Sequence, residues 1–513
     1  MLRRIFHAAN AIVFGHSIVR LGSLVLVPLF LRYWSGSLYG EYVALFAAVS
    51  YLSGLDIGMQ QAVVNRLTQA YAKKDLVEYR SVQHTALAFY IVLAFSITLL
   101  MAALAWVLPI PHWIGLKLTR PNIATLVIIL LATYVMWTMP MRLITAVYQT
   151  MGNLARSQWI ANAQQVLVVI LSALVLIYGG GMLAIAFLQV LTVACTALFV
   201  LVDVRWRFPV FFPGIAGAKF SVLKELAHPS ILFALLLVGN LIAYQGSIVL
   251  VSATMGGLAV AVLSISKTMI DVIRQGLYSI SLALCPDFAR LEALGEFEKL
   301  RKLHRMTVAA TGAITLAFVA SIWFEGPQII SVWTRGRIEP DVILLRLFLV
   351  LVAFQTPWAA SSTVATATNR HKVQAVGYFF AAIVGIGLVA AFVPFIGAWA
   401  VPLGLTLGEA ICCYHFVIQA SCHIIGEPYR AFAARFWLGF ISVTMTALAT
   451  GWIVHSMLPG PMLLRWVAIG LSTLTVAGAC AWMVWLVPED RALLLPKKAF
   501  STQHSASEAA LSN

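Results

Sequence analysis

The chain has 513 residues, of which 61% are hydrophobic and only 10% are charged, and its mean hydropathy is +0.92. Soluble proteins carry roughly 25% charged residues, so this composition excludes a soluble enzyme, a disordered chain and a secreted disulfide scaffold. The apolar stretches are continuous over about 20 residues, without the alternation of a β-barrel strand. The sequence therefore predicts an all-α polytopic membrane protein.

Apolar stretches long enough to cross a membrane occur about fourteen times. The first is interpreted as an uncleaved span, because Arg20 interrupts it and no small-residue cleavage site follows. The predicted spans lie near residues 9–31, 42–65, 83–109, 122–148, 158–178, 182–203, 230–254, 257–284, 306–324, 341–364, 374–394, 397–420, 435–457 and 462–487. An even number of spans places both termini on the same side of the membrane.

The basic residues decide which side that is. Lys and Arg number 34 against 19 Asp and Glu, giving a net charge of +15. Of these cations, 23 fall in loops on the side of the N-terminus, 6 fall in the opposite loops and 5 lie within spans. Because cytoplasmic loops carry the excess of Lys and Arg, we expect both termini to be cytoplasmic. Basic cytoplasmic loops beside anionic lipid are usual in polytopic membrane proteins. They account for most of the net positive charge, so a nucleic-acid partner is not needed to explain it.

Two pairs of similar segments within the sequence indicate that the chain consists of two lobes. The loop that follows Gly54-Leu55 resembles the loop that follows Gly276-Leu277, and the pattern Asn-x-x-basic-x-Gln occurs at 153–158 and again at 369–374. Both pairs of segments are separated by a similar number of residues. This spacing predicts two six-helix lobes in the same orientation, a parallel pseudo-repeat. The expected division is an N-terminal lobe at 1–204, a cytoplasmic linker at 205–229, a C-terminal lobe at 230–424, two further helices at 425–487 and a cytoplasmic tail at 488–513.

Enzymatic chemistry finds no support in the sequence. No loop exceeds about 27 residues, so an ATP-binding domain has no room, and no metal-binding, nucleophile-elbow or phosphate-loop motif is present. The six cysteines lack the paired spacing of a metal site. Tryptophans such as Trp113 and Trp358 are interpreted as membrane-interface belts. We expect neither enzyme activity nor a cofactor or metal.

Polar residues within the predicted spans are the candidate site, because a charge at mid-bilayer costs roughly 2.5 to 3.5 kcal/mol on insertion scales. Lys267, Asp271 and Arg274 are spaced i, i+4 and i+7, which places them on one helix face. With Arg20 from the other lobe, the two cations would form an anion site, since guanidinium forks suit phosphate oxygens. The full substrate-binding set is Arg20, Lys267, Arg274, Gln245 and His16.

Three acidic residues at similar depth are candidates for ion coupling, namely Asp56, Asp271 and Glu409. A simpler alternative for each is structural: Lys267 and Asp271 can neutralise each other along their helix, and Glu409 can have a structural partner. Arg142 and Arg346 lie near span ends, where they are expected to reach the headgroups.

The N-terminal stretch RLGSLVLVPLFLRYWSGSLYGEYVALFAAVSYLSGLDIGMQQAVVNRL resembles the polysaccharide transporter family, the Wzx-type flippases of O-antigen and exopolysaccharide assembly. The matching features are Pro28 with Leu31, the segment Tyr39–Tyr42, the stretch from Gly54 to Gly58, and Asn65-Arg66. This family belongs to a superfamily that also holds the MATE drug exporters and the MurJ lipid II flippases.

The resemblance implies an alternating-access flippase in the bacterial cell inner membrane. Its cargo would be an undecaprenyl-diphosphate-linked oligosaccharide, moved from the cytoplasmic to the periplasmic leaflet with ion exchange. Membrane lipids, a glycan polymerase and glycosyltransferases of the same pathway are the implied partners of a monomer. The main alternative is a MATE-type multidrug or cation antiporter, which would present acidic residues to cationic drugs. A scaffold or polymerase of glycan assembly is a third class, but it would need larger external loops.

Overall fold

The computed structural model describes residues 22, 24–56, 59–227, 231–368 and 370–485, and within these ranges the chain is helical and contains no strand. An apolar helix covers Leu24–Tyr33. The N-terminal group then comprises α2 Gly36–Ser50, η1 Tyr51–Asp56, α3 Met59–Ala72, α4 Leu76–Val107, α5 Ile110–Trp113, α6 Pro121–Thr150, α7 Leu154–Ile177 and α8 Met182–Arg207.

The connection to the second half contains η2 Pro209–Phe211 and α9 Phe220–Ala227. The C-terminal group comprises α10 Ile231–Asn240, η4 Leu241–Gly246, α11 Ser247–Met255, α12 Gly257–Ala293, α13 Phe297–Trp333, α14 Val342–Ala367, α15 Lys372–Ile396, η5 Gly397–Trp399, α16 Ala400–Glu409, η6 Ala410–Tyr414, α17 His415–Ile425, α18 Tyr429–Met457 and α19 Met462–Val484. The segments η4 and η6 are π-helical.

Eleven helical segments of the described chain are long and apolar enough to cross a membrane. One of them, Lys372–Ile425, is 54 residues long and contains both predicted spans 374–394 and 397–420. The predicted span near 257–284 corresponds to α12, which carries three charged side chains in its middle. The expectation of an all-α polytopic membrane protein is therefore confirmed, whereas the count of fourteen spans stays a prediction.

Side-chain caps start several of these helices. Ser35 accepts a hydrogen bond from the backbone N–H of Leu38 at the start of α2, and Asp75 does the same for Glu78 at the start of α4. Asp341 caps α14 through Leu344. Such caps satisfy N–H groups that have no partner within the helix, so they fix where each helix begins.

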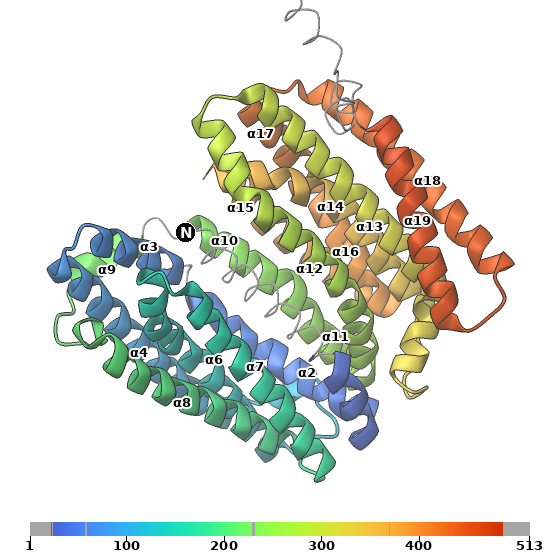
Figure 1. Ribbon diagram of the computed structural model, residues 1–513. Coiled ribbons are helices and arrows are strands. Elements are labelled where there is room, and N and C mark those ends of the chain that lie inside the picture. Colours follow the sequence, from blue (N-terminus) through green and yellow to red (C-terminus); the bar gives the residue numbers. More distant parts are fainter. Residues whose placement is uncertain (1–21, 23, 57–58, 228–230, 369, 486–513) are drawn as a thin grey trace, which may run out of the picture.

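The helices form two groups (Figure 1). In the first, α6 packs against α4 and α8; in the second, α13 packs against α14 and α19, and α15 packs against α16. The two C-terminal helices, α18 and α19, pair with each other along the side of α13. The division into lobes expected from the sequence, with boundaries at 204, 229 and 424 and a parallel repeat, stays a prediction.

The two groups meet closely at one end. There α2 crosses α12 at Gly40 and Gly257, and a Cβ built on Gly40 would overlap the carbonyl oxygen of Gly257. Trp333 at the end of α13 donates its indole N–H to the backbone oxygen of Leu24 at 2.7 Å. Arg337 donates to the backbone oxygens of Leu31 and Arg32. The loops at this end are those predicted to face the outside of the cell.

Glu41 holds the same end of the N-terminal group together. Its side chain is buried, at 1% exposed, and it accepts hydrogen bonds from the backbone N–H groups of Lys117, Leu118 and Thr119 and from the Thr119 hydroxyl. A buried carboxylate needs such donors to offset the loss of water. Glu41, part of the segment that carries the family resemblance, therefore anchors the loop between α5 and α6.

At the predicted cytoplasmic end, ion pairs connect neighbouring helices on each side of the molecule. Arg66 on α3 bridges Glu78 and Glu225, which brings α9 against α3 and α4. Arg370, next to the start of α15, pairs with Glu292 at the end of α12. The basic residues at this end are thus partly used to fasten the short connections.

Candidate functional site

A cavity of about 570 Å³ lies within the C-terminal group, bounded by α10, η4, α12, α13, α14 and α15. Its wall combines the charged residues of α12 with aromatic, amide and hydroxyl side chains from the facing helices. It is large enough to hold part of a small-molecule ligand.

The charged side chains form a compact group on α12. The Lys267 ammonium lies 2.7 Å from one carboxylate oxygen of Asp271, and the Arg274 guanidinium lies 3.5 Å from the other. Both cations also face the Tyr244 ring, with Arg274 at 4.4 Å and Lys267 at 5.2 Å from its centroid. Two cations thus share the Asp271 carboxylate, and this group of three side chains carries a formal charge of +1.

Glu409 lies behind the opposite wall. It is 4% exposed and accepts hydrogen bonds from Gln355 Nε2 at 2.5 Å and from Trp358 Nε1 at 3.1 Å. Gln355 also donates to the Tyr244 hydroxyl at 3.0 Å. A chain of polar contacts therefore runs from the cation-facing ring of Tyr244 through Gln355 to the buried carboxylate.

Both π-helical segments border this chain of contacts. Tyr244 and Gln245 lie within η4, and Glu409 immediately precedes η6. A π-helical turn shifts the following side chains relative to an α-helix, and such turns occur frequently at functional sites. The two π-helical segments therefore lie next to Tyr244 and Glu409, which both accept a hydrogen bond from Gln355.

The cavity extends from the middle of the helices toward one end. Along α12 it reaches from Lys267 to Cys285, a rise of about 27 Å at 1.5 Å per residue. It also reaches Thr366 and Gln374, which flank the short α14–α15 connection. This is the end that carries the predicted cytoplasmic loops, opposite to the Gly40–Gly257 crossing.

The neutral part of the wall is rich in groups that can hydrogen-bond or stack. Trp358 and Tyr378 place their ring centroids 5.7 Å apart, and Asn240 donates to the Tyr378 hydroxyl at 3.4 Å. Hydroxyl side chains also line the wall, namely Thr311, Thr356, Ser362, Thr363 and Thr366.

The predicted site residues fall into four sets, of which Asp56 alone forms the last. Lys267, Arg274, Gln245 and Asp271 line the cavity together. Glu409 touches its wall from behind. Arg20 and His16 lie outside the described residues, so their meeting with Arg274 stays a prediction.

Asp56 is the predicted ion-coupling residue that lies elsewhere. It ends η1 in the N-terminal group, accepts a hydrogen bond from Tyr90 and lies within electrostatic range of Arg142. It is not part of the cavity wall. The contacts of the other two acidic residues also agree with a purely structural role. Asp271 forms an ion pair with Lys267, and Glu409 accepts hydrogen bonds from two donors.

The sequence reasoning missed Tyr244, Gln355 and Tyr378. Gln355 lies inside a predicted span, so its polarity was a signal that could have singled it out. The interpretation of Trp358 as a membrane-interface residue is wrong, because its side chain is 7% exposed and donates to Glu409. Buried indoles need a partner for their N–H, and here the carboxylate supplies it.

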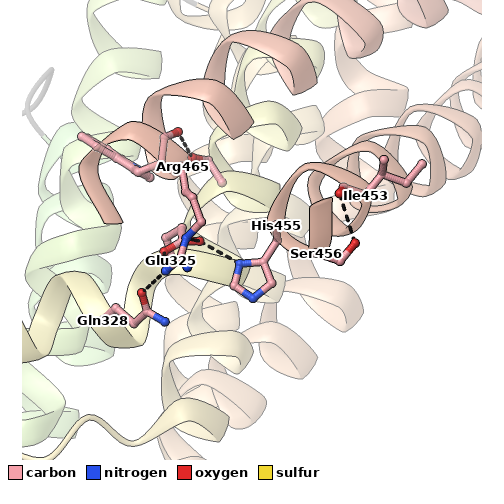
Figure 2. A network of polar contacts seen from close by, with 8 residues as sticks. Glu325, Gln328, Ile453, His455, Ser456 and Arg465 are labelled. Atoms are coloured by element: carbon pink, nitrogen blue, oxygen red, sulfur yellow. Dashed lines mark hydrogen bonds and ion pairs between the residues drawn. The ribbon is translucent and has the colours of Figure 1, made fainter. Parts of the chain in front are cut away.

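A second polar network lies away from the cavity, where α18 and α19 join α13 (Figure 2). Glu325 on α13 is fully buried, and Arg465 donates to both of its oxygens at 3.1 and 3.2 Å. His455 contacts Glu325 at 2.7 Å through Nδ1, and Arg465 also donates to Gln328 at 2.6 Å. Figure 2 shows these four side chains converging from three helices. The network fastens the last helix pair to the C-terminal group.

No protein-family model and no curated protein sequence matches the chain. Several solved structures, however, are similar to this chain. A multidrug resistance MATE family transporter of the MOP superfamily, in an inward-facing conformation, superposes with a TM-score of 0.68 at 16% identity, covering 80% of this chain and 98% of that one. The lipid II flippase MurJ, in an inward closed conformation, gives 0.68 at 13% identity, covering 93% and 98%.

A MOP superfamily transporter from Pyrococcus furiosus, described as having a binding pocket of reverse polarity, gives a TM-score of 0.59 at 16% identity, covering 83% of this chain and 96% of that one. At these identities the likeness concerns the fold. The chain therefore has the fold shared by MATE transporters and the MurJ flippase.

Proposed function

We propose that this protein is an alternating-access flippase that moves a lipid-diphosphate-linked oligosaccharide from the cytoplasmic to the outer leaflet of the inner membrane. The observation that carries the proposal is the cavity in which Lys267 and Arg274 share Asp271 and leave a positive charge. A diphosphate is the group that such a site would hold, since Arg and Lys are the residues that bind phosphate oxygens.

The fold supports a transport role. It is similar to those of MATE transporters and of MurJ, which is named as a flippase of a lipid-linked substrate. Of these two, MurJ is matched over the larger share of this chain. Under this proposal the protein binds and releases its substrate unchanged, without enzyme activity or a cofactor.

The neutral wall suits the sugar part of such a substrate. The neighbouring rings of Trp358 and Tyr378, together with hydroxyl and amide groups of the wall, can contact the faces and hydroxyls of a glycan. The lipid tail would remain in the bilayer. Glycosyltransferases and a polymerase of the same pathway would supply and consume the substrate.

The arrangement of the two groups supports an inward-facing state. With the predicted topology, the cavity reaches toward the cytoplasm, and the crossing of α2 and α12 at Gly40 and Gly257 closes the outer end. Transport then requires this crossing to separate while the cytoplasmic side closes. A tight glycine contact supports such a step, because packed interfaces switch between discrete arrangements rather than deform continuously.

A MATE-type drug exporter remains the alternative. A cationic drug would compete with Lys267 and Arg274 for Asp271, so the charge of the cavity disfavours it. The experiment is deletion of the gene, followed by complementation and measurement of surface polysaccharide. Loss of a surface glycan that the wild-type chain restores supports the flippase. An unchanged set of glycans combined with sensitivity to cationic dyes would instead identify an exporter.

A further inference from the structure

Glu409 is in contact with the cavity wall although it does not line the cavity. Both of its hydrogen-bond donors, Gln355 and Trp358, are cavity-lining side chains. A ligand that touches either side chain is therefore one residue away from a buried carboxylate.

The charge of the cavity depends on this carboxylate. Arg274 lies within electrostatic range of both Glu409 and Asp271. With Glu409 ionised, the two acidic side chains balance Lys267 and Arg274; with Glu409 protonated, one positive charge remains. Since charges interact strongly in a site of low polarity, the protonation of Glu409 changes how well the cavity holds an anion.

The other groups that face Glu409 do not alter this balance. Tyr244 from η4, Tyr378 from α15 and Cys413 from η6 lie within electrostatic range of it. Phenols and thiols ordinarily ionise well above pH 7, so these groups are neutral at physiological pH. Arg274 is the charged side chain that faces Glu409 from α12.

We propose that Glu409 is a proton-binding site linked to anion binding in the cavity, so that an anionic ligand and a proton are taken up together. The inference rests on the proposed anion site. It follows from reciprocity: if protonation of Glu409 favours the anion, the bound anion favours protonation by the same factor. The proton comes from water, and it replaces the negative charge of Glu409 as the negative ligand enters.

A proton fits this site better than a metal ion. Both carboxylate oxygens of Glu409 face N–H donors, whereas hard cations such as Ca²⁺ and Mg²⁺ are bound by oxygen ligands. Across the described ranges, no three His, Cys, Asp or Glu side chains are grouped to hold a metal. A carboxylic acid would keep its place between Gln355 and Trp358, since the Gln355 amide can turn its oxygen toward the new O–H.

The test uses the full-length protein in lipid nanodiscs, with farnesyl diphosphate as the anionic probe. Isothermal titration in buffers of different ionisation enthalpy measures the protons taken up per ligand bound, between pH 5.5 and 8.5. The variant Glu409→Gln is neutral and similar in shape, and Glu325→Gln removes a buried carboxylate away from the cavity. Inorganic sulfate, which does not titrate in this range, separates protonation of the protein from that of the probe.

For the wild type we expect net proton uptake and a loss of affinity of about tenfold on going from acidic to alkaline pH, from one unfavourable charge interaction in a partly screened site. Glu409→Gln should bind sulfate with no proton uptake and with the same affinity at every pH, while folded Glu325→Gln should show the proton uptake and the pH dependence of affinity of the wild type. Equal pH dependence in wild type and Glu409→Gln overturns the linkage and leaves the flippase proposal intact. Failure of the wild type to bind either probe at any pH overturns the anion site itself.

Discussion

Gly40 on α2 and Gly257 at the start of α12 cross so closely that neither can carry a Cβ without a backbone clash. A Cβ on Gly40 would overlap the carbonyl oxygen of Gly257, and a Cβ on Gly257 would overlap that of Ser37. Small residues allow this approach of helix backbones in membrane proteins. The crossing joins the two helix groups at the end opposite to the cavity opening.

Gly40→Ala should weaken this junction. Because the clashing atoms belong to the backbone, α2 and α12 must move apart, and overpacking of this kind typically costs about 1–3 kcal/mol. The expected result is a lower midpoint of thermal unfolding in detergent. The control is Gly478→Ala on α19, where nothing lies within 4 Å of an added Cβ. Equal stability of the two variants would contradict the tight crossing.

Arg274→Ala should abolish complementation of surface glycan under the proposed function. Loss of a charged hydrogen bond to phosphate costs about 2–5 kcal/mol, which corresponds to roughly a thirtyfold to several-thousandfold loss of affinity. Arg274→Lys keeps the charge but not the planar fork, so it should restore glycan only in part. Arg20→Ala should give the same loss as Arg274→Ala.

The matched controls are Arg346→Ala and Arg142→Ala. Arg346 lies 5.0 Å from the centroid of the Trp323 ring and, like Arg142, is outside the cavity wall. Both variants should retain most surface glycan at equal membrane abundance. If they fail as completely as Arg274→Ala, the cavity residues have no special role.

Arg465→Ala should destabilise the packing of α18 and α19 on α13. It leaves the fully buried Glu325 without its bidentate partner, and breaking a buried pair typically costs about 3–5 kcal/mol. The double variant Glu325→Leu, Arg465→Met should recover much of this loss, because it leaves no unpaired charge. Limited proteolysis and thermal unfolding both report the change.

The control for that comparison is an exposed ion pair of similar length. Lys299 and Glu296 lie 2.7 Å apart, with 68% and 36% of their side chains exposed. Lys299→Ala should change the unfolding free energy by about 1 kcal/mol or less. A loss as small for Arg465→Ala would show that the network contributes little.

Glu427, in the connection between α17 and α18, should make stability sensitive to acid. Burial raises the pKa of this carboxyl, but His304 at 3.7 Å and Arg305 at 3.1 Å favour its ionised form more strongly, so its pKa lies below the ordinary 4.5. A lowered pKa in the folded state adds stability above the unfolded value, and that stability is lost as the pH falls through the folded pKa.

The measurement is the unfolding midpoint of wild type and Glu427→Gln as a function of pH. The wild type should be more stable by a constant margin above about pH 5, and the margin should shrink below pH 4.5. Glu292→Gln, which breaks the more exposed pair with Arg370, serves as a comparison. A margin that stays constant down to pH 3 would exclude this role of Glu427.

Reporter fusions should place both termini and the loops at 66–80, 205–224 and 286–305 in the cytoplasm. The reason is the imbalance of basic residues between the two sets of loops. A C-terminal fluorescent fusion should be bright and a C-terminal phosphatase fusion inactive. The reverse pattern would mean an odd number of spans and would break the account of two equally oriented lobes.

The sequence by itself determined the membrane-spanning, all-helical class and the charged face of α12. Both depend on local properties: apolar length decides whether a segment can cross a bilayer, and the helical period decides that Lys267, Asp271 and Arg274 share a face. The structure confirms this clustering, with Asp271 between the two cations.

Only the tertiary structure decided what faces these charges. Gln355 and Glu409 are 54 residues apart in sequence, and their contact depends on how α14 packs against α16. It also separated Asp56 from the other acidic candidates by placing it beside Tyr90. Helical periodicity fixes the direction of a side chain around its own axis, but the partner it meets is set by the packing of distant helices, which no local pattern encodes.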